Sequence, residues 1–516
     1  MKETEILWVD DEIDLLKPHI IFLESKGYKL ETANNGTDAI EMVREKAYGL
    51  VFLDENMPGL SGLETLIEIK NIRPNLRVIM ITKSEEEYIM DEAIGSKIDD
   101  YLIKPVNPKQ ILMAIKKITD QKRLVSEKTN STYQVEFGKL GIQINDSLSA
   151  EDWKNIYKKL VFWELELEKS GGEGMDQVLH MQKEDANKSF AKFIKNNYVD
   201  WFKGNAHEKP LMSHNVFKEK VFPTIKEEQQ VVLVIDNLRF DQWKIIEPLI
   251  REYYSVEEED LFFSILPTAT QFARNSMFAG LMPSEIEKLH PELWVNEDED
   301  GAKNQFEEEL MRKQMSRLGI TESFYYDKAS NIEKGRKILN NVSQILNNQL
   351  SVIVVNFVDM LSHARTEMDM IRELANDEAA YRSITHSWFE HSSLFELIKV
   401  LANKKVKLGI TTDHGTIRVN NPVKVAGDKH ISTNLRYKQG KSLSYNPKQV
   451  FEVTNPQDIH LPKLNVSSSY IFAQNEDFLA YPNNFNHYVS YYKNTFQHGG
   501  VSLEEVIIPF ITLKPR

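Results

Sequence analysis

The chain has no cysteine among its 516 residues. Disulfides, thiolate zinc ligands and a cysteine nucleophile are therefore excluded, so a transition-metal site would need histidine and carboxylate ligands. It also lacks any apolar run near the roughly 18 residues of a membrane span, and its start, MKETEILWVDDE, has no signal-peptide pattern. We therefore expect a cytoplasmic protein without a membrane span.

The chain has fewer basic than acidic residues, 63 Lys and Arg against 77 Asp and Glu. The formal net charge is −14 at pH 7, which opposes nonspecific attraction to a nucleic-acid backbone. The middle of the chain mixes lysine with abundant glutamate and aspartate and offers no basic recognition helix. We expect no DNA recognition, and an anionic substrate would need a local cationic site.

The length predicts about three domains at roughly 100 to 200 residues each. Residues 1–120 alternate short apolar runs with amphipathic segments, which indicates a doubly wound α/β domain. Its expected strands are 6–9, 51–53, 78–81 and 101–103.

Residues 121–222 are highly charged, with aromatic and aliphatic residues at helical intervals, and predict a helical bundle that links the flanking domains. Its glycine cluster, Gly171, Gly172 and Gly174, indicates a helix–helix turn, because no apolar strand precedes it and no GKS or GKT follows.

Residues 223–516 resume the alternation of strands and helices, and 420–486 predict an irregular or β-rich insertion. Three apolar runs, 231–235, 352–358 and 408–412, end at Asp236, Asp359 and Asp413. Ligand sites of open α/β sheets gather beyond the carboxyl ends of such strands. We expect Asp359 and His363, in DMLSH, to converge from a strand end and the following turn. With His414 and the late His498 of HGG, these residues predict a metal site.

A second set of polar residues ends the strands of the first domain: Asp10, Asp11, Asp54, Thr82 and Lys104. Clustered carboxylates bind Mg²⁺ through oxygen, and the ion neutralises a phosphoryl group that arrives on a carboxylate. A threonine hydroxyl and a lysine ammonium at neighbouring strand ends would contact the same phosphoryl group.

The segments WVDDE, FLDENMPGLSG, MITKS and YLIKPV resemble the receiver domain of bacterial response regulators over residues 1–120. The resemblance implies that Asp54 is the phosphoacceptor. It also implies a magnesium site made by Asp10, Asp11, Asp54 and the Asn56 carbonyl. Thr82 and Lys104 would sense the phosphoryl group, and Tyr101 would be the switch aromatic. The helical segment then acts as a spacer that transmits receiver pairing, or as a passive connector.

A candidate nucleophile lies in LPTATQFARNSMFAGLMP, where Thr268 or Thr270 precedes a helix-compatible stretch that ends at Gly280. A hydroxyl at a helix N-terminus gains from the dipole and the exposed amides, which favour an alkoxide and the phosphoryl group it attacks.

The order Asp, PTxT, DxxxH, DHG and HGG resembles the alkaline phosphatase superfamily, and VLVIDNLRFDQW, TTDHGT and QHGGVSLEEVIIP are similar to its PglZ branch. The resemblance implies Thr270 as nucleophile and two zinc sites. One would use Asp236, Thr270, Asp413 and His414, and the other Asp359, His363 and His498. Arg274, one helical turn after Thr270, is interpreted either as a clamp for the substrate phosphate or as part of an ordinary ion pair on the helix surface. The basic stretch Lys429, His430, Arg436 and Lys441 is interpreted either as a contact for an anionic substrate or as a solvated loop.

A threonine nucleophile without cysteine favours a phosphodiesterase over a sulfatase. The arrangement of receiver, helical segment and PglZ domain resembles the PglZ-type response regulators associated with type IX secretion. This implies cyclic and linear oligonucleotide substrates, a sensor histidine kinase and a sigma factor as partners, and activation by Asp54 phosphorylation and homodimerisation. The alternative is a signalling adaptor whose PglZ domain binds a sigma factor or secretion component with little catalysis.

Overall fold

The structure, a computed structural model, describes residues 5–83, 98–119, 121–146, 148–171, 174–203, 209–296, 299, 301–375, 377–427, 432, 434–463 and 467–516. The chain divides into two compact units, Met1–Thr129 and Asn130–Arg516. Among the described helices, none combines the length and the hydropathy that crossing a bilayer requires.

The first unit contains a five-stranded parallel sheet of order β2-β1-β3-β4-β5. Its strands are β1 (Glu5–Val9), β2 (Lys29–Ala33), β3 (Leu50–Asp54), β4 (Val78–Thr82) and β5 (Asp100–Ile103). The four expected strands are confirmed. The sequence did not reveal β2, because KLETA is a polar strand at the sheet edge and only its last residue is buried.

Helices follow these strands as in a doubly wound domain: α1 (Lys17–Glu24), α2 (Gly36–Glu45), α3 (Gly62–Ile72) and α5 (Pro108–Thr119). Ser61 begins α3 with a capping box, in which its hydroxyl accepts from the backbone N–H of Glu64. Strand β3 is buried along its whole length, so its last residue, Asp54, is held at the carboxyl edge of the sheet by a rigid core.

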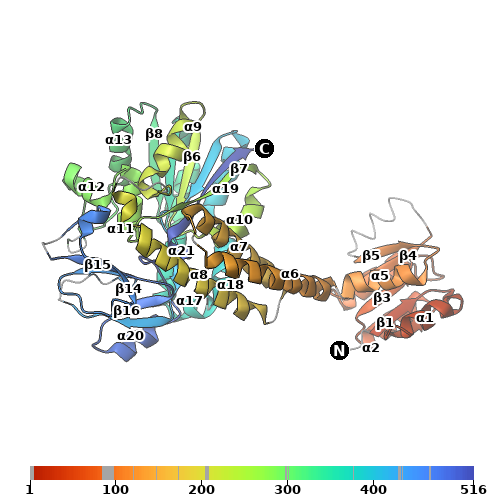
Figure 1. Ribbon diagram of the computed structural model, residues 1–516. Coiled ribbons are helices and arrows are strands. Elements are labelled where there is room, and N and C mark those ends of the chain that lie inside the picture. Colours follow the sequence, from red (N-terminus) through yellow and green to blue (C-terminus); the bar gives the residue numbers. More distant parts are fainter. Residues whose placement is uncertain are drawn as a thin grey trace. The chain divides into compact units, whose positions relative to one another are not determined.

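The second unit is built on a mixed six-stranded sheet of order β7-β18-β10-β6-β9-β8 (Figure 1). The strands are β6 (Gln230–Ile235), β7 (Tyr254–Phe263), β8 (Phe324–Ala329), β9 (Leu350–Val355), β10 (Lys407–Thr411) and β18 (Ile507–Pro515). Strands β10, β6, β9 and β8 are parallel, while β18 is antiparallel to both β10 and β7. The carboxyl ends of β6, β9 and β10 therefore meet at one edge, as the three apolar runs predicted.

Helices and short sheets surround this core. The helices are α9 (Phe222–Ile225), α10 (Phe240–Ile250), α11 (Thr270–Ala279), α12 (Pro283–Leu289), α13 (Glu307–Arg317), α14 (Ile332–Asn340), α15 (Val342–Leu346), α16 (Phe357–Glu367), α17 (Asp369–Leu374), α18 (Glu378–Glu390), α19 (Ser393–Asn403), α20 (Phe485–Tyr492) and α21 (Leu503–Val506). The short strands are β11 (Ile417–Arg418), β12 (Asn421–Lys424), β13 (Tyr437–Gly440), β14 (Val450–Val453), β15 (Ser469–Ala473), β16 (Asp477–Ala480) and β17 (Phe496–Gln497). The expected β-rich insertion is confirmed.

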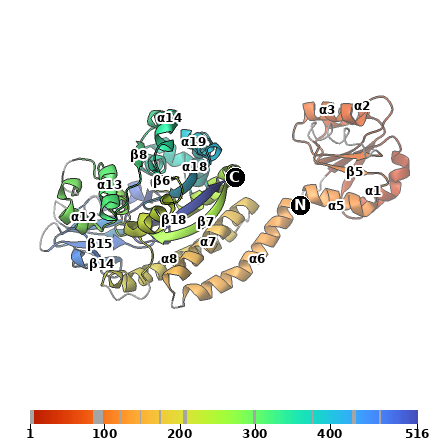
Figure 2. The same ribbon diagram turned by 90° about the horizontal axis from the view of Figure 1, so that it is seen from above.

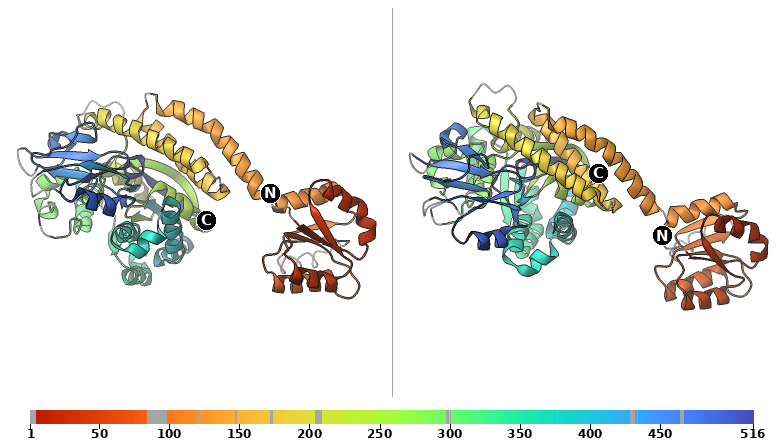
Figure 3. Two further views of the ribbon diagram at one scale, coloured as in Figure 1. Left: turned by 90° about the horizontal axis from the view of Figure 1, so that it is seen from below. Right: turned by 60° about the horizontal axis from the view of Figure 1, so that its bottom comes forward.

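The helical segment consists mainly of α6 (Gln121–Ile144), α7 (Ala150–Ser170) and α8 (Met175–Asn197). From Asn130 onward it shares one hydrophobic core with residues 223–516, and α7 and α8 run alongside that part of the chain (Figures 2 and 3). Helix α7 contacts strand β7 through the ion pair of Lys154 with Asp260. The glycine turn is confirmed, because Gly171 ends α7 in the left-handed conformation that favours glycine.

One expectation about local structure is wrong. The apolar run 352–358 is not a single strand, because β9 ends at Val355 and α16 begins at Phe357. Asp359 and His363 therefore lie four residues apart on one helix. The sequence hid this boundary because the first two residues of α16 are apolar, with Phe357 half-buried and Val358 fully inaccessible, so the apolar pattern continues from strand into helix.

Candidate metal centre and receiver site

The sheet edge brings the expected C-terminal ligands together in two groups. Asp236, Asp413 and His414 offer ligand atoms that all lie within 4.8 Å of one another, and all three are buried. Asp236 follows β6, whereas Asp413 and His414 follow β10, so two adjacent parallel strands position them. Thr270 joins this group as the first residue of α11.

Thr270 occupies the position expected of a nucleophile. Its Oγ1 lies 3.0 Å from Nε2 of His414 and 3.5 Å from Oδ1 of Asp236. The helix α11 has ten residues, and its first backbone N–H groups have no intrahelical acceptor. Thr270 is half-buried, whereas Thr268 is fully buried. Only Thr270 is therefore both accessible and in contact with the carboxylate and imidazole group.

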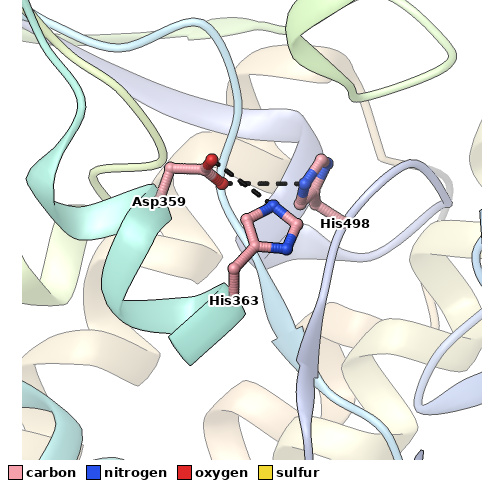
Figure 4. A group of neighbouring side chains, drawn as sticks. All are labelled: Asp359, His363 and His498. Atoms are coloured by element: carbon pink, nitrogen blue, oxygen red, sulfur yellow. Dashed lines mark ion pairs between the residues drawn. The ribbon is translucent and has the colours of Figure 1, made fainter. Parts of the chain in front are cut away.

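The second group is formed by Asp359, His363 and His498, whose ligand atoms also lie within 4.8 Å of one another. Figure 4 shows both imidazoles turned toward the Asp359 carboxylate. The Nε2 of His363 lies 3.4 Å from Oδ2 of Asp359, and the Nε2 of His498 lies 3.7 Å from Oδ1. The rings of His414 and His498 stack at 4.2 Å, so the two groups adjoin each other.

Backbone carbonyls determine which nitrogen His414 and His498 present to the centre. The Nδ1 of His414 lies 3.2 Å from the carbonyl of Gly415, and the Nδ1 of His498 lies 3.2 Å from the carbonyl of Thr268. A proton on Nδ1 donates to that carbonyl and leaves the Nε2 lone pair for a metal. Burial, helped by nearby His414, lowers the pKa of His498 to about 3, so this ring is neutral, as a ligand must be.

The donor set fits two divalent metals. Carboxylate oxygens and imidazole nitrogens suit zinc, and the sequence supplies no thiolate. Oδ2 of Asp413 is buried without a hydrogen-bond donor in the described part of the chain, as expected of an oxygen reserved for a metal. Burial also raises the pKa of Asp236 well above its ordinary value, against the opposing Arg274 guanidinium and with the added repulsion of Asp413.

The expected substrate contact of Arg274 is not supported. Its side chain is fully buried, with Nη1 2.9 Å from Oδ2 of Asp236 and Nε 2.8 Å from Oε1 of Glu307. It is equally no surface ion pair. The arginine lies one helical turn after Thr270, but its guanidinium is occupied by the buried carboxylates of Asp236 and Glu307. It therefore orients Asp236 and cannot clamp a phosphate in this conformation.

Arg436 corrects a second expectation about substrate contacts. It is fully buried and forms a bidentate pair with Glu505, with Nε 3.1 Å from Oε1 and Nη2 2.6 Å from Oε2. A guanidinium held in this way has no surface to offer a ligand. Lys429 and His430 lie outside the described residues, and Lys441 is exposed.

The receiver residues also converge. Asp10, Asp11 and Asp54 offer ligand atoms within 4.8 Å of one another, and the Nζ of Lys104 lies 3.0 Å from both Asp10 and Asp54. Burial is the largest cause that raises the pKa of Asp54 to about 6, against the effect of Lys104. The Asp54 carboxyl is buried, and of the three clustered carboxylates Asp10 and Asp54 share Lys104, so this arrangement suits a divalent cation.

The remaining receiver residues lie around that cluster. The Thr82 hydroxyl donates to Glu55, and Thr82 is buried. Asn56 is exposed two residues after Asp54. Tyr101 is 39% exposed, so its ring lies at the surface in this conformation.

Sequence reasoning missed several residues that shape the centre. Asn237 has a positive φ of 65°, and its Nδ2 lies 3.4 Å from Oδ1 of Asp359 and 3.2 Å from Oγ of Ser362. Glu307 comes from α13 to meet Arg274. Asn237, directly after Asp236 in the DN pair, carried a detectable turn signal. Glu307 carried none, since the fold alone brings it there.

Three family models match the chain. The BREX system PglZ alkaline phosphatase-like domain matches residues 216–513, the PorX response regulator linker domain matches 123–202, and the response regulator receiver domain matches 6–116. A receiver domain implies a histidine kinase as partner, and receiver and alkaline phosphatase-like domains generally use divalent metals.

Similar curated proteins match mainly over the receiver. The transcriptional regulatory protein ZraR of Klebsiella oxytoca is 34% identical over 140 residues, which cover 27% of this chain and 32% of that protein. The CpxR homolog of Haemophilus influenzae is 32% identical over 155 residues, covering 30% of this chain and 66% of that protein. The matched segments thus span about a third to two thirds of these relatives.

Solved structures match the same part. A receiver domain protein from Clostridium thermocellum is 32% identical and covers 23% of this chain and 98% of its own, with a TM-score of 0.22. The chemotaxis protein CheY4 of Vibrio cholerae, crystallised at low pH, is 24% identical, covers 22% and 98%, and has a TM-score of 0.22. Because the PglZ model spans more than half of the sequence, the chain belongs to the PglZ alkaline phosphatase-like family, in the PorX-type fusion of receiver, linker and PglZ domain.

Proposed function

We propose that the chain is a response regulator whose output is a two-zinc phosphodiesterase acting on cyclic and linear oligonucleotides. The observation that carries the proposal is the position of Thr270, half-buried at a helix N-terminus with its hydroxyl 3.0 Å from His414 and 3.5 Å from Asp236. A centre that used metal only for structure would need no accessible hydroxyl at this point.

The proposed ligands divide as the two groups do. Asp236, Thr270, Asp413 and His414 would hold one zinc. Asp359, His363 and His498 would hold the other. Bound zinc would supply positive charge to the phosphoryl oxygens and lower the pKa of a coordinated hydroxyl.

The chain's own residues would then carry the reaction. Oγ1 of Thr270, 3.5 Å from Oδ1 of Asp236, attacks phosphorus and forms an O–P bond as the bond to the leaving oxygen breaks, and the hydroxyl proton passes to solvent. The leaving oxygen departs with a proton from solvent. Backbone N–H groups of the first turn of α11 face developing negative charge with the positive end of the helix dipole. Water then hydrolyses the phosphothreonine and restores the hydroxyl.

Regulation would start at the receiver. We propose that a sensor histidine kinase phosphorylates Asp54, with Mg²⁺ held by Asp10, Asp11, Asp54 and the Asn56 carbonyl, and with Thr82, Lys104 and Tyr101 reading the phosphoryl group. Phosphorylation would promote a homodimer and raise hydrolysis. A role in the regulation of type IX secretion, with a sigma factor as partner, is part of the proposal because the chain resembles PglZ-type response regulators. The match to the PorX linker model supports the response-regulator arrangement alone.

Hydrolysis of bis-p-nitrophenyl phosphate and of short cyclic and linear oligonucleotides by wild type, Thr270→Ala and Thr270→Ser tests the proposal. We expect at least a thousandfold loss for Thr270→Ala and partial activity for Thr270→Ser. Zinc measured by mass spectrometry should remain bound in Thr270→Ala through the other three ligands of that site, Asp236, Asp413 and His414, so the loss of activity reports the missing nucleophile. Equal rates in wild type and Thr270→Ala would remove the nucleophile. Bound zinc without hydrolysis by wild type would favour the adaptor.

A further inference from the structure

The short helix α21 lies between the linker helix α8 and both loops that carry the metal-site histidines. Its neighbouring residues Glu504 and Glu505 are buried and bind different partners. Glu504 contacts the linker, whereas Glu505 contacts the loop that follows His498. We call α21 and these two side chains the relay.

The linker side of the relay is formed by Asn187 and Lys183 of α8. The Nδ2 of Asn187 donates to Oε2 of Glu504 at 3.1 Å, and its Oδ1 accepts the backbone N–H of Leu503 at 2.8 Å. The Nζ of Lys183 lies 3.5 Å from Oε1 of Glu504. All these groups are buried or nearly so, and solvent cannot replace a lost partner without a rearrangement.

The metal side begins at Glu505. Its Oε1 accepts the backbone N–H of Gly500 at 2.8 Å, and Arg436 holds both of its carboxylate oxygens. A side chain at Gly500 would collide with the carbonyl of Ala473 at 2.6 Å and with Arg436 at 2.9 Å. The HGG loop is therefore clamped two residues after His498.

The relay also touches the other loop. The backbone N–H of Gly415, next to His414, donates to the carbonyl of Glu505 at 3.3 Å. A Cβ at Gly415 would lie 1.9 Å from the carbonyl oxygen of Glu504, so only glycine permits this approach. One short helix therefore fixes the glycines that follow His414 and His498.

We infer that α8 positions His414 and His498 through the relay, so that the position of the linker helix sets how tightly the centre holds metal. The inference rests on the proposed function, whose centre it would regulate. Helix α8 is in turn tied to α6, because Tyr133 donates to Gln182 and Gln182 donates to the carbonyl of Phe137. Helix α6 begins in the first compact unit and ends in the second, so a displacement of α6 has a physical route through α8 to the metal loops.

Linkage makes the dependence reciprocal: if the position of α8 changes metal affinity, then metal must change the stability of α8 by the same factor. Hydrogen exchange measures this directly. In the wild type, zinc should slow amide exchange in α8 around Lys183 and Asn187. In Asn187→Leu, zinc should still protect the loops but no longer α8.

The test compares full-length wild type, Asn187→Leu and Lys183→Met, with Lys188→Met as matched control. Lys188 lies on the same helix and is exposed, and among the described residues it pairs with half-buried Glu184 and exposed Asp185 of its own helix. We expect zinc transfer to a chromophoric chelator to become at least tenfold faster in the two relay variants and to stay unchanged in the control. Thermal unfolding of the zinc-free proteins identifies any variant that has lost its fold. If Asn187→Leu does not fold, Lys183→Met still tests the inference, because methionine keeps the aliphatic part of the lysine side chain.

The inference would be overturned if folded relay variants transferred zinc to the chelator as slowly as the wild type. It would also be overturned if zinc did not change amide exchange in α8 of the wild type. No substrate enters these measurements. If zinc retention depends on the relay but the protein hydrolyses no substrate, the inference about the relay is supported and only the proposed activity is overturned. A wild type that retains no zinc would contradict both.

Discussion

Arg274 and Asp236 form an ion pair that solvent does not reach, with Nη1 2.9 Å from Oδ2 and both side chains at most 2% exposed. The guanidinium also serves Glu307, 2.8 Å from its Nε, which in turn binds Lys328. One oxygen of Asp236 is thus held by the protein, while the other faces Thr270. Arg274 therefore fixes the direction in which Asp236 offers its free oxygen.

Replacing Arg274 by glutamine should be strongly destabilising. The change leaves Asp236 buried without its cation and Glu307 with Lys328 alone, and removing one partner of a buried pair costs about 3 to 5 kcal/mol. Arg312→Gln is the matched control, because Arg312 forms an exposed pair with Glu308 and should cost about 0.3 to 0.5 kcal/mol. Urea unfolding of the zinc-free proteins measures both. Similar losses in the two variants would contradict a special role for the buried pair.

Thr268 should matter for a different reason from Thr270. Its hydroxyl donates to the carbonyl of Gly500 at 2.9 Å and accepts the N–H of Gly499 at 3.0 Å, so it anchors the HGG loop. Thr268→Val leaves those buried groups unpaired, at about 1 to 3 kcal/mol, and should loosen the zinc bound through His498. Thr268→Ser should restore zinc retention in a chelator assay. A valine variant that keeps zinc like the wild type would contradict this anchoring role.

The sequence predicted the strands and the site because both depend on local patterns. Apolar runs reveal buried parallel strands, and polar residues at their carboxyl ends converge wherever those strands are neighbours. Asp236 and Asp413 follow adjacent strands and meet as expected. The predicted boundary before Asp359 was wrong because Phe357 and Val358, the first residues of α16, continued the apolar pattern of the strand.

Roles that depend on tertiary packing could not be predicted in this way. The sequence favours Arg274 and Arg436 as substrate contacts, because a cationic side chain near a site for an anionic substrate is most simply interpreted as a ligand for that substrate. Their actual partners, Glu307 and Glu505, lie 33 and 69 residues away in sequence, and no short-range pattern links such pairs. The same holds for α8, whose contact with Glu504 spans 317 residues.

Stability should depend on pH through His214. Burial, with help from Lys209 and His460, lowers its pKa to about 3, and Glu285 also lines its cavity. The folded state keeps the ring neutral while the unfolded chain protonates near pH 6.5. Stability is therefore full above pH 6.5 and is lost as pH falls toward 3, by about 1 kcal/mol between pH 6.5 and 5.5. Urea unfolding of wild type and His214→Gln should show a shallower pH dependence in the variant, and equal slopes would contradict the assignment.

Asp54 should control association of the full chain. Beryllofluoride with Mg²⁺ mimics an acyl phosphate, and the Asp54 carboxylate, 3.0 Å from Lys104, is the proposed acceptor. Sedimentation velocity should show a shift of the wild type from monomer to dimer, and Asp54→Asn should stay monomeric because the amide cannot form the adduct. Asp14→Asn is the matched control, since this carboxylate is 86% exposed and, within the described part of the first unit, pairs with Lys17. A wild type that remains monomeric, or an Asp54→Asn variant that dimerises with beryllofluoride, would rule out activation by this route.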